Sequence, residues 1–338
     1  MRKSYRFIHG LLGLGMLTGH MLLPGAAALA QATLKPVKIG AINVLTFSPI
    51  YVARELGYFK DEGLAVELFE TNSGTALNAA LLAGSVVATA SGYSHTMIMA
   101  DKGKHLKAIV GMEMASPYVF LVNPKLNILA DDPQAMANAL RGKRFGVVSV
   151  GSGGHMTAEA LLTHYGVPKN QITFVAVGTG ASALAAMKSG AVDALDPTEP
   201  DVTQILDAGV AVKALDLRTT KTEKVFSLLP SSTIQSTADW IANNQDTAAA
   251  IVRAITRAND TLRNDSKTSL SVLVKIYPNF SPEQIEKFYS SSKQNFKSEI
   301  SEDQFKVAHD IYMSSGLIKN PVKYETVVAT EFKPLWLK

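Results

Sequence analysis

The segment VKIGAINVLTFSPIYVARELGYFKDEGLAVELFE, residues 37–70, sets a pattern that the chain repeats. Its apolar run Val37–Ile42 is typical of a buried strand, and Pro49–Tyr58 has helical periodicity. Ser48 is a suitable N-cap, and the proline after it is favourable at the first helical position. A second strand is expected at Ala65–Glu70. This strand–helix–strand order predicts parallel strands with helices on the faces of the sheet.

The same alternation continues to about residue 229 and then stops. In a first block, strands are also expected at Val87–Ala90 and Leu106–Gly111, with helices at Thr75–Ala83 and Ser94–Lys102. In a second block, strands are expected at Arg144–Ser149, Ile172–Val177, Ala191–Leu195 and Val210–Leu215, with helices at His155–Tyr165, Ser182–Ser189 and Pro200–Asp207. After Thr237 only helices are predicted, at Ala238–Asn264, Lys267–Tyr277, Pro282–Asn295 and Glu302–Ser315.

Two apolar runs, Tyr118–Val122 and Val225–Leu229, are interpreted as crossings between the blocks. The predicted fold class is therefore α/β, with two α/β lobes, a two-stranded hinge and a helical C-terminal segment. The first lobe is expected to contain residues 31–121 and 227–338, and the second residues 122–226. A single large doubly wound sheet is the alternative.

Residues 1–30 are predicted to be a secretory signal peptide. Arg2, Lys3 and Arg6 precede an apolar stretch, and Ala28-Leu29-Ala30 is a small-x-small cleavage site, so cleavage is expected after Ala30. A membrane anchor is the alternative, but the apolar stretch is short and interrupted by glycine. The mature protein is expected in the periplasm.

Charge and cysteine content narrow the function classes. Three of the 33 basic residues lie in the predicted leader, which leaves 30 basic and 29 acidic residues in the mature chain. This balance gives no electrostatic reason to expect binding to nucleic acid. The chain has no cysteine, so disulfides, thiolate metal sites, a cysteine nucleophile and a lipid-modified cysteine are excluded.

Polar loops follow most predicted strands, where α/β proteins bind ligands. These loops are rich in hydroxyl groups and glycine, and helix N-termini add free backbone N–H groups. Each loop alone is consistent with ordinary helix capping, but several facing one cleft would form a pocket. Glu199 is the carboxylate placed to face the ligand, where it would favour a donor such as an amine, and the alternative is a surface rim residue without a function. Phe47 and Tyr93 are candidates for either the pocket wall or the core. The candidate ligand-binding residues are Asn43, Thr46, Phe47, Ser48, Ser73, Ser91, Tyr93, Ser152, Gly153, His155, Thr179, Thr198 and Glu199.

Known catalytic and cofactor motifs do not fit the sequence. Gly151-Ser152-Gly153 lacks the third glycine of a dinucleotide loop, because residue 156 is Met156. Gly92-Tyr93-Ser94-His95-Thr96 lacks the second glycine of a hydrolase nucleophile turn. His155 and Glu159 are spaced four apart, but no second histidine completes a metal site. We therefore predict no catalytic residue, no metal and no cofactor.

The stretch from Ser48 to Leu64, and above all GYFKDEGL, resembles bacterial ABC-transporter solute-binding proteins for nitrate, sulfonates, taurine and thiamine-precursor pyrimidines. Leu140–Val147 and Ala185–Ala194 are similar to later segments of the same family. The resemblance implies a type II periplasmic-binding-protein fold and delivery of solute to an ABC permease in the inner membrane. A related eukaryotic branch makes the thiamine pyrimidine from its own side chain, but it is cytosolic and has a cysteine at its site.

We therefore expect a monomeric, non-enzymatic protein that captures a small organic anion or heteroaromatic solute, of sulfonate, aromatic-acid or pyrimidine type. Basic residues directed at the cleft are not evident from the sequence, which argues against a simple inorganic anion. The alternatives are an exported enzyme on the same scaffold and a ligand-sensing module for a membrane receptor.

Overall fold

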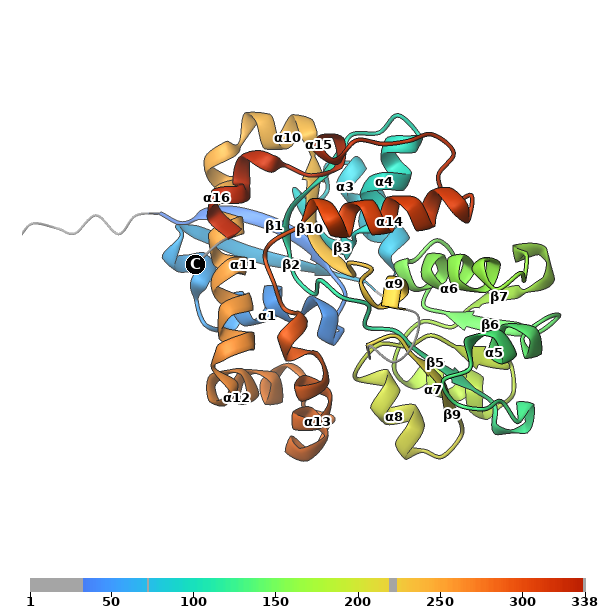
Figure 1. Cartoon of the computed structure of the whole chain (residues 1–338). Helices are drawn as coiled ribbons and strands as arrows, with labels where there is room; N and C mark the ends of the chain where they lie inside the picture. The colour runs from blue at the N-terminus through green and yellow to red at the C-terminus, as the bar shows by residue number, and fades with distance from the viewer. Residues whose placement is uncertain (1–32, 72, 219–223, 337–338) are drawn as a thin grey trace, which may run out of the picture. The chain divides into compact units, whose positions relative to one another are not determined.

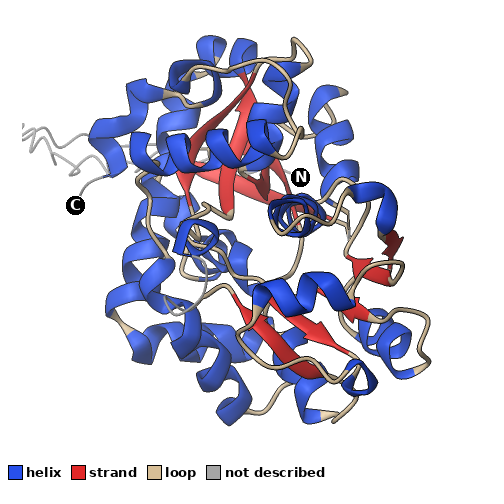
Figure 2. Cartoon of the chain, turned by 45° about the vertical axis from the view of Figure 1, so that its right-hand side comes forward, coloured by secondary structure: helices blue, strands red, loops and turns tan. Residues whose placement is uncertain are grey.

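The computed structural model describes residues 33–71, 73–218 and 224–336 (Figure 1). From Leu34 onward the chain forms one compact unit, which contains two five-stranded sheets (Figure 2). The predicted leader, residues 1–30, lies outside the described residues, so its cleavage stays a prediction. In the part of the chain that the structure describes, no helix combines the length and the apolar character needed to cross a membrane.

The first sheet consists of β1 (Lys35–Ala41), β2 (Leu64–Glu70), β3 (Ala88–Gly92), β4 (Leu106–Gly111) and β10 (Ser232–Thr237). Their order is β2-β1-β3-β10-β4. β1 is parallel to β2 and β3, as predicted. β10 was not predicted, and it lies antiparallel between β3 and β4. Its buried Gln235 donates through Nε2 to the carbonyl of Gly92 at 2.7 Å, which shows how a polar strand is accommodated inside the sheet.

The second sheet consists of β5 (Val119–Val122), β6 (Arg144–Val147), β7 (Thr173–Ala176), β8 (Ala194–Leu195) and β9 (Val212–Asp216). Their order is β7-β6-β8-β5-β9. β6 is parallel to β7 and β8, whereas β5 is antiparallel to β8 and β9. The run Tyr118–Val122, interpreted as a crossing, is therefore largely a strand of this sheet. Both sheets are mixed, which corrects the prediction of parallel sheets.

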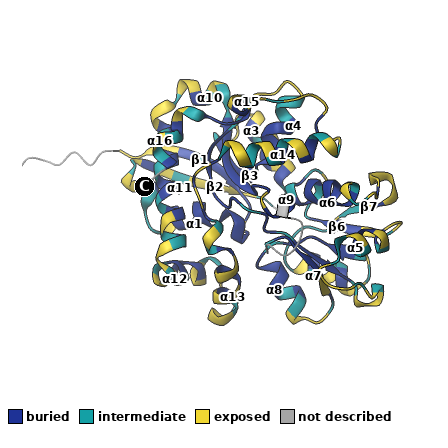
Figure 3. Ribbon diagram, in the orientation of Figure 1, coloured by how far each residue is buried: buried dark blue, intermediate teal, exposed yellow. Residues whose placement is uncertain are grey.

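Helices cover the sheets, and the strands β3, β4, β5 and β10 between them are almost wholly buried (Figure 3). The predicted helix Pro49–Tyr58 is divided because Gly57, with φ of 76°, adopts a left-handed conformation that ends α1. α5 was not predicted. The helices up to the hinge are α1 (Ser48–Glu55), α2 (Tyr58–Asp61), α3 (Gly74–Leu82), α4 (Ser94–Asp101), α5 (Pro133–Ala139), α6 (Gly153–His164), α7 (Ala181–Lys188), α8 (Asp201–Asp207) and α9 (Lys224–Ser227).

The C-terminal segment is helical, as predicted, and much of it packs on the first sheet (Figure 1). The predicted helix Ala238–Asn264 is interrupted at Asn244, whose φ of −139° and ψ of 41° are not helical. The long helix after it buries Ile251, Ile255 and Leu262. These helices are α10 (Ala238–Asn243), α11 (Gln245–Asn264), α12 (Ser266–Ile276), α13 (Pro282–Ser292), α14 (Glu302–Ser314), α15 (Tyr324–Val327) and α16 (Lys333–Trp336), and the 3₁₀ turns of the chain are η1 (Leu45–Phe47), η2 (Pro124–Leu126), η3 (Lys169–Gln171), η4 (Lys293–Asn295) and η5 (Thr330–Phe332).

Two segments, residues 112–118 and the described residues 217–218 and 224–231, lie between strands of the two sheets. The second contains the run Val225–Leu229, which was interpreted as the return crossing, and α9 lies in it. The two segments bind each other, because the carbonyl of Glu113 accepts hydrogen bonds from the N–H groups of Ser231 and Ser232, both at 3.1 Å. They form the predicted two-stranded hinge. The exact lobe boundaries, 31–121, 122–226 and 227–338, stay a prediction.

The side chain of Glu113 is buried in this hinge. Neither carboxyl oxygen has a hydrogen-bond partner of normal geometry among the described residues. Burial raises the pKa of Glu113 to about 7, although Thr46, Ser292, Asn295 and the charge of Arg218 act in the opposite direction. The folded protein therefore keeps a proton on Glu113 that the unfolded chain, with a pKa of 4.5, releases at lower pH.

We expect Glu113→Gln to change how stability depends on pH. Because the pKa is higher in the folded state, the wild type loses stability as the pH rises from about 4.5 to about 7, by roughly 3 kcal/mol in total. The variant has no such group, so its free energy of unfolding relative to the wild type should rise between about pH 5 and about pH 8. Urea unfolding at both pH values measures this. Glu286→Gln, an exposed residue of α13, is the control, and a difference between Glu113→Gln and wild type that does not vary with pH would contradict the prediction.

Candidate functional site

A cavity of about 70 Å³ lies where the carboxyl ends of β1 and β3 face the loops that follow β6, β7 and β8. Seven predicted site residues line it: Thr46, Phe47, Ser91, Ser152, Gly153, Thr179 and Thr198. Its lining also includes residues that were not predicted: Ile42, Val44, Gly74, Ala90, Gly92, His95, Tyr118, Val148, Gly154 and Ser231. None of the described lining residues is a lysine or an arginine.

A larger groove of about 600 Å³ lies elsewhere, between α6, α9 and α14. Its walls are largely apolar, with Lys306 and Asp310 paired to each other at 2.6 Å. We place the candidate site in the smaller cavity, because strand ends and helix N-termini of both lobes and several hydroxyl groups converge there, whereas the larger groove lies between helices.

Five of the predicted residues have other surroundings. Asn43 is exposed, and Ser73 caps α3 by accepting from the N–H of Ala76. The hydroxyl of Ser48 lies 3.3 Å from that of Tyr277 in the core, and Tyr93 is also a core residue. His155 packs edge-on against Phe174, and its Nδ1 accepts from the N–H of Gly151. None of the five lines the cavity.

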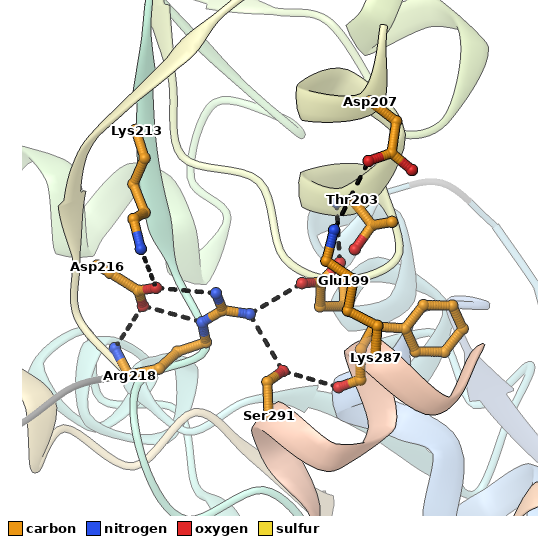
Figure 4. Close-up of polar contacts among 9 residues, drawn as sticks. Glu199, Thr203, Asp207, Lys213, Asp216, Arg218, Lys287 and Ser291 are labelled. Atoms are coloured by element: carbon orange, nitrogen blue, oxygen red, sulfur yellow. Dashed lines mark hydrogen bonds and ion pairs between the residues drawn. The ribbon is translucent and has the colours of Figure 1, made fainter. Parts of the chain in front are cut away.

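Glu199 does not line the cavity either, and Figure 4 shows its carboxylate in contact with Arg218. Arg218 donates to one carboxylate oxygen at 2.9 Å, and the N–H of Thr203 donates to the other at 3.0 Å. Arg218 is bound in turn by Asp216 through two hydrogen bonds of 2.9 Å. Glu199 is therefore bound by Arg218, a largely buried side chain 19 residues farther along the chain, and is not among the residues that line the cavity.

The hydroxyl groups of the cavity differ in how far they are already bound. Thr46 bonds to the hydroxyls of Ser231 and Ser232 at 3.0 and 3.2 Å, and Ser152 caps α6 by accepting from the N–H of His155. Within the described chain, the hydroxyls of Thr179 and Thr198 make no hydrogen bond, so they can bind a ligand without breaking one. The first N–H groups of α6 have no partner inside the helix and carry its positive dipole end.

His95 joins the two sides of the cavity. Its Nε2 lies 3.0 Å from the carbonyl oxygen of Gly151, and its Nδ1 lies 3.1 Å from the hydroxyl of Ser91. Burial lowers the pKa of His95, which favours the neutral ring. In the tautomer with the hydrogen on Nε2, this atom donates to Gly151 and Nδ1 accepts from Ser91, while Nδ1 also lies 3.2 Å from the carbonyl oxygen of Gly92. Sequence motifs could not identify this role, because it depends on a carbonyl in the other lobe.

Further contacts hold the two sides close together. A Cβ on Gly92 would lie 3.5 Å from the Cα of Gly153, so the backbones nearly touch there. At another point, the N–H of Leu45 donates to the carbonyl of Glu199 at 3.1 Å. Farther along, Asp207 of α8 accepts from Gln284 of α13 at 3.0 Å. The two sides of the cleft are therefore in contact around the cavity, in a closed arrangement.

Residues 45–268 match the family described as NMT1/THI5 like. YtlA of Bacillus subtilis strain 168 is 22% identical over 314 residues, which covers 90% of this chain and 91% of that protein. A 4-amino-5-hydroxymethyl-2-methylpyrimidine phosphate synthase of Uromyces fabae is 24% identical over 238 residues, or 68% of this chain and 67% of the relative.

Solved structures show the same fold. A protein of Bordetella bronchiseptica RB50 aligns with a TM-score of 0.75 and 23% identity over 88% of this chain and 98% of its own. The alkanesulfonate-binding protein SsuA of Xanthomonas axonopodis pv. citri, bound to MOPS, aligns with a TM-score of 0.71 and 18% identity over 86% and 96%. The prediction of a type II periplasmic-binding-protein fold with a helical C-terminal segment is confirmed.

We expect His95→Ala to shift the unliganded protein towards open conformations, because it removes the hydrogen bond to Gly151. The chain has no cysteine, so spin labels can be placed on Ser85→Cys and Ser189→Cys, which are exposed on opposite sides of the cleft. Double electron–electron resonance should show a longer mean distance in the variant. His105→Ala, at an exposed histidine, is the control. An unchanged distance distribution would exclude this role for His95.

Proposed function

The chain belongs to the NMT1/THI5-like family, and we propose that it is the solute-binding component of an ABC importer. In this proposal it works as a monomer in the periplasm and delivers its solute to an inner-membrane permease. The observation that carries the proposal is the cavity between the two lobes, which is lined by hydroxyl groups and the start of α6. Closure around a solute would be a hinge motion of the segments that Glu113 joins.

The cavity favours a small organic anion or a heteroaromatic solute of sulfonate, aromatic-acid or pyrimidine type. The first N–H groups of α6, near Gly153, and the hydroxyls of Thr179 and Thr198 are neutral donors suited to oxygen or ring-nitrogen acceptors. Ile42, Phe47 and other apolar residues can pack against hydrocarbon or a ring. At about 70 Å³ the cavity is smaller than the usual ligand site, so we expect it to widen around an aromatic solute.

An exported enzyme is the second candidate. It is favoured by relatives named as synthases and by the presence of His95 in the cavity lining. Against it, both ring nitrogens of His95 are already hydrogen-bonded, and a general base needs a free nitrogen within reach of the substrate. Incubation with any solute that binds separates the two candidates, because a binding protein returns that solute unchanged and an enzyme does not.

Binding can be tested with a thermal-shift panel of sulfonates, aromatic acids and pyrimidines. A solute at about 100 times its dissociation constant should stabilise the folded protein by about 2.7 kcal/mol. The double variant Thr179→Val with Thr198→Val should lose most of this shift while its own melting temperature stays close to wild type, because neither hydroxyl has a partner in the described structure. Thr173→Val, exposed on β7, is the control. Equal shifts in the double variant and the wild type would move the site elsewhere.

A further inference from the structure

Asp196, directly after β8, is the buried carboxyl without a partner near the candidate site. Its side chain is almost completely enclosed, with 3% of its surface exposed. Its Oδ2 makes no hydrogen bond to any residue that the structure describes. Burial holds the pKa of this carboxyl well above its ordinary value. Buried polar groups are normally paired, so this exception calls for an explanation.

The other acidic side chains at this end of the second sheet are paired, and the unpaired Glu113 lies in the hinge and does not line either cavity. Glu199 and Asp216 bind Arg218, and Oδ2 of Asp201 accepts from the N–H of Gly180 at 2.7 Å. These partners explain why three carboxylates are tolerated at this end of the second sheet. They also remove those three groups from the set that could bind a solute, which leaves Asp196.

Asp196 lies immediately behind the wall of the cleft. A small cavity of about 20 Å³, which Asp196 lines, shares Val148, Thr179 and Thr198 with the main cavity. The carboxyl also lies against Gly154, since a Cβ on Gly154 would be 2.8 Å from Oδ2. The absence of a side chain there brings the acid close to the start of α6.

We propose that Asp196 determines specificity by binding an N–H group of the solute, so that the solute carries an amino or amidine nitrogen. This inference rests on the proposed function. The two ends of such a solute would bind to different kinds of group. Its acceptor end would bind the N–H groups of α6 and the free threonine hydroxyls, which are donors. Its nitrogen would enter the small cavity, where the acid is an acceptor. There the carboxyl, adjacent to Thr179 and Thr198, would accept a hydrogen bond from the nitrogen, and this bond becomes charge-assisted where the nitrogen is cationic and the carboxyl releases its proton to solvent.

A metal ion fits the same carboxyl less well. Oxygen-bound metal ions need several ligands, and no group of three or more histidine or acidic side chains in the described chain could hold one. Asp196 and Asp201 are the only acidic residues that line the small cavity as described, and Asp201 is already bound to Gly180. A single nitrogen donor needs only the one free oxygen that Asp196 offers.

The test compares probes that differ only in an amino and a methyl group: taurine with propanesulfonate, para-aminobenzoate with para-toluate, and aminopyrimidine with methylpyrimidine. Each is titrated against the full-length mature protein by thermal shift and calorimetry. In at least one pair, the amino member should bind about tenfold or more tightly than the methyl member. Asp196→Asn should abolish that preference, and Asp131→Asn, at an exposed aspartate, should retain it.

The melting temperature of the unliganded variant gives a second readout. A purely structural carboxyl would lower it when replaced, whereas an unpaired one should leave it unchanged or higher in Asp196→Asn at neutral pH. A fall of several degrees, or equal binding of both members of every pair that binds, overturns the role of Asp196 alone. If no probe of any pair binds, the proposed solute classes are wrong and the role of Asp196 falls with them.

Discussion

The backbone of Glu113 is the junction on which the arrangement depends. Its carbonyl accepts from the N–H groups of Ser231 and Ser232, and its own N–H donates to the hydroxyl of Ser232 at 3.0 Å. These bonds tie together the two segments that connect the sheets. An opening motion about these bonds would break the contacts of His95 and of α13 and would leave the hydrogen bonds within each sheet in place. A cavity enclosed by loops from both sheets follows from this geometry.

Apolar runs and helical periodicity were sufficient to predict most of the framework. The strands that were predicted correctly are those whose burial shows in their own sequence, such as Leu106–Gly111. β10 could not be found in this way, because STIQST contains one strongly apolar residue and its polar side chains bond to neighbouring strands. The division of the first predicted helix depends on the left-handed Gly57, and glycine adopts that conformation in some contexts only.

The candidate site was predicted less completely, and for a different reason. Helix N-caps and strand ends are local features, so the loops with Ser152, Thr179 and Thr198 could be located. Whether a polar side chain in such a loop is free to bind depends on partners that are distant in sequence. Arg218 removes Glu199 from the cleft, and the carbonyl of Gly151 orients His95. Asp196 and Glu199 lie in the same loop after β8. The sequence favoured Glu199 as the ligand-facing acid, whereas the structure leaves Asp196 without a partner.

Some polar groups around the cavity are already hydrogen-bonded within the protein and others are free, and this difference determines which of them can recognise a solute. Groups that are already engaged, such as His95, which joins the lobes, and Ser152, which caps α6, cannot change partners without weakening the closed state or the helix. A solute must then be recognised by the few groups that remain: two threonine hydroxyls, the first N–H groups of α6 and one buried acid. The hydroxyls and N–H groups are donors of neutral charge and tolerate many acceptors. Discrimination between solutes of one size therefore falls to the acid, since a buried unpaired carboxyl disfavours every solute that cannot satisfy it.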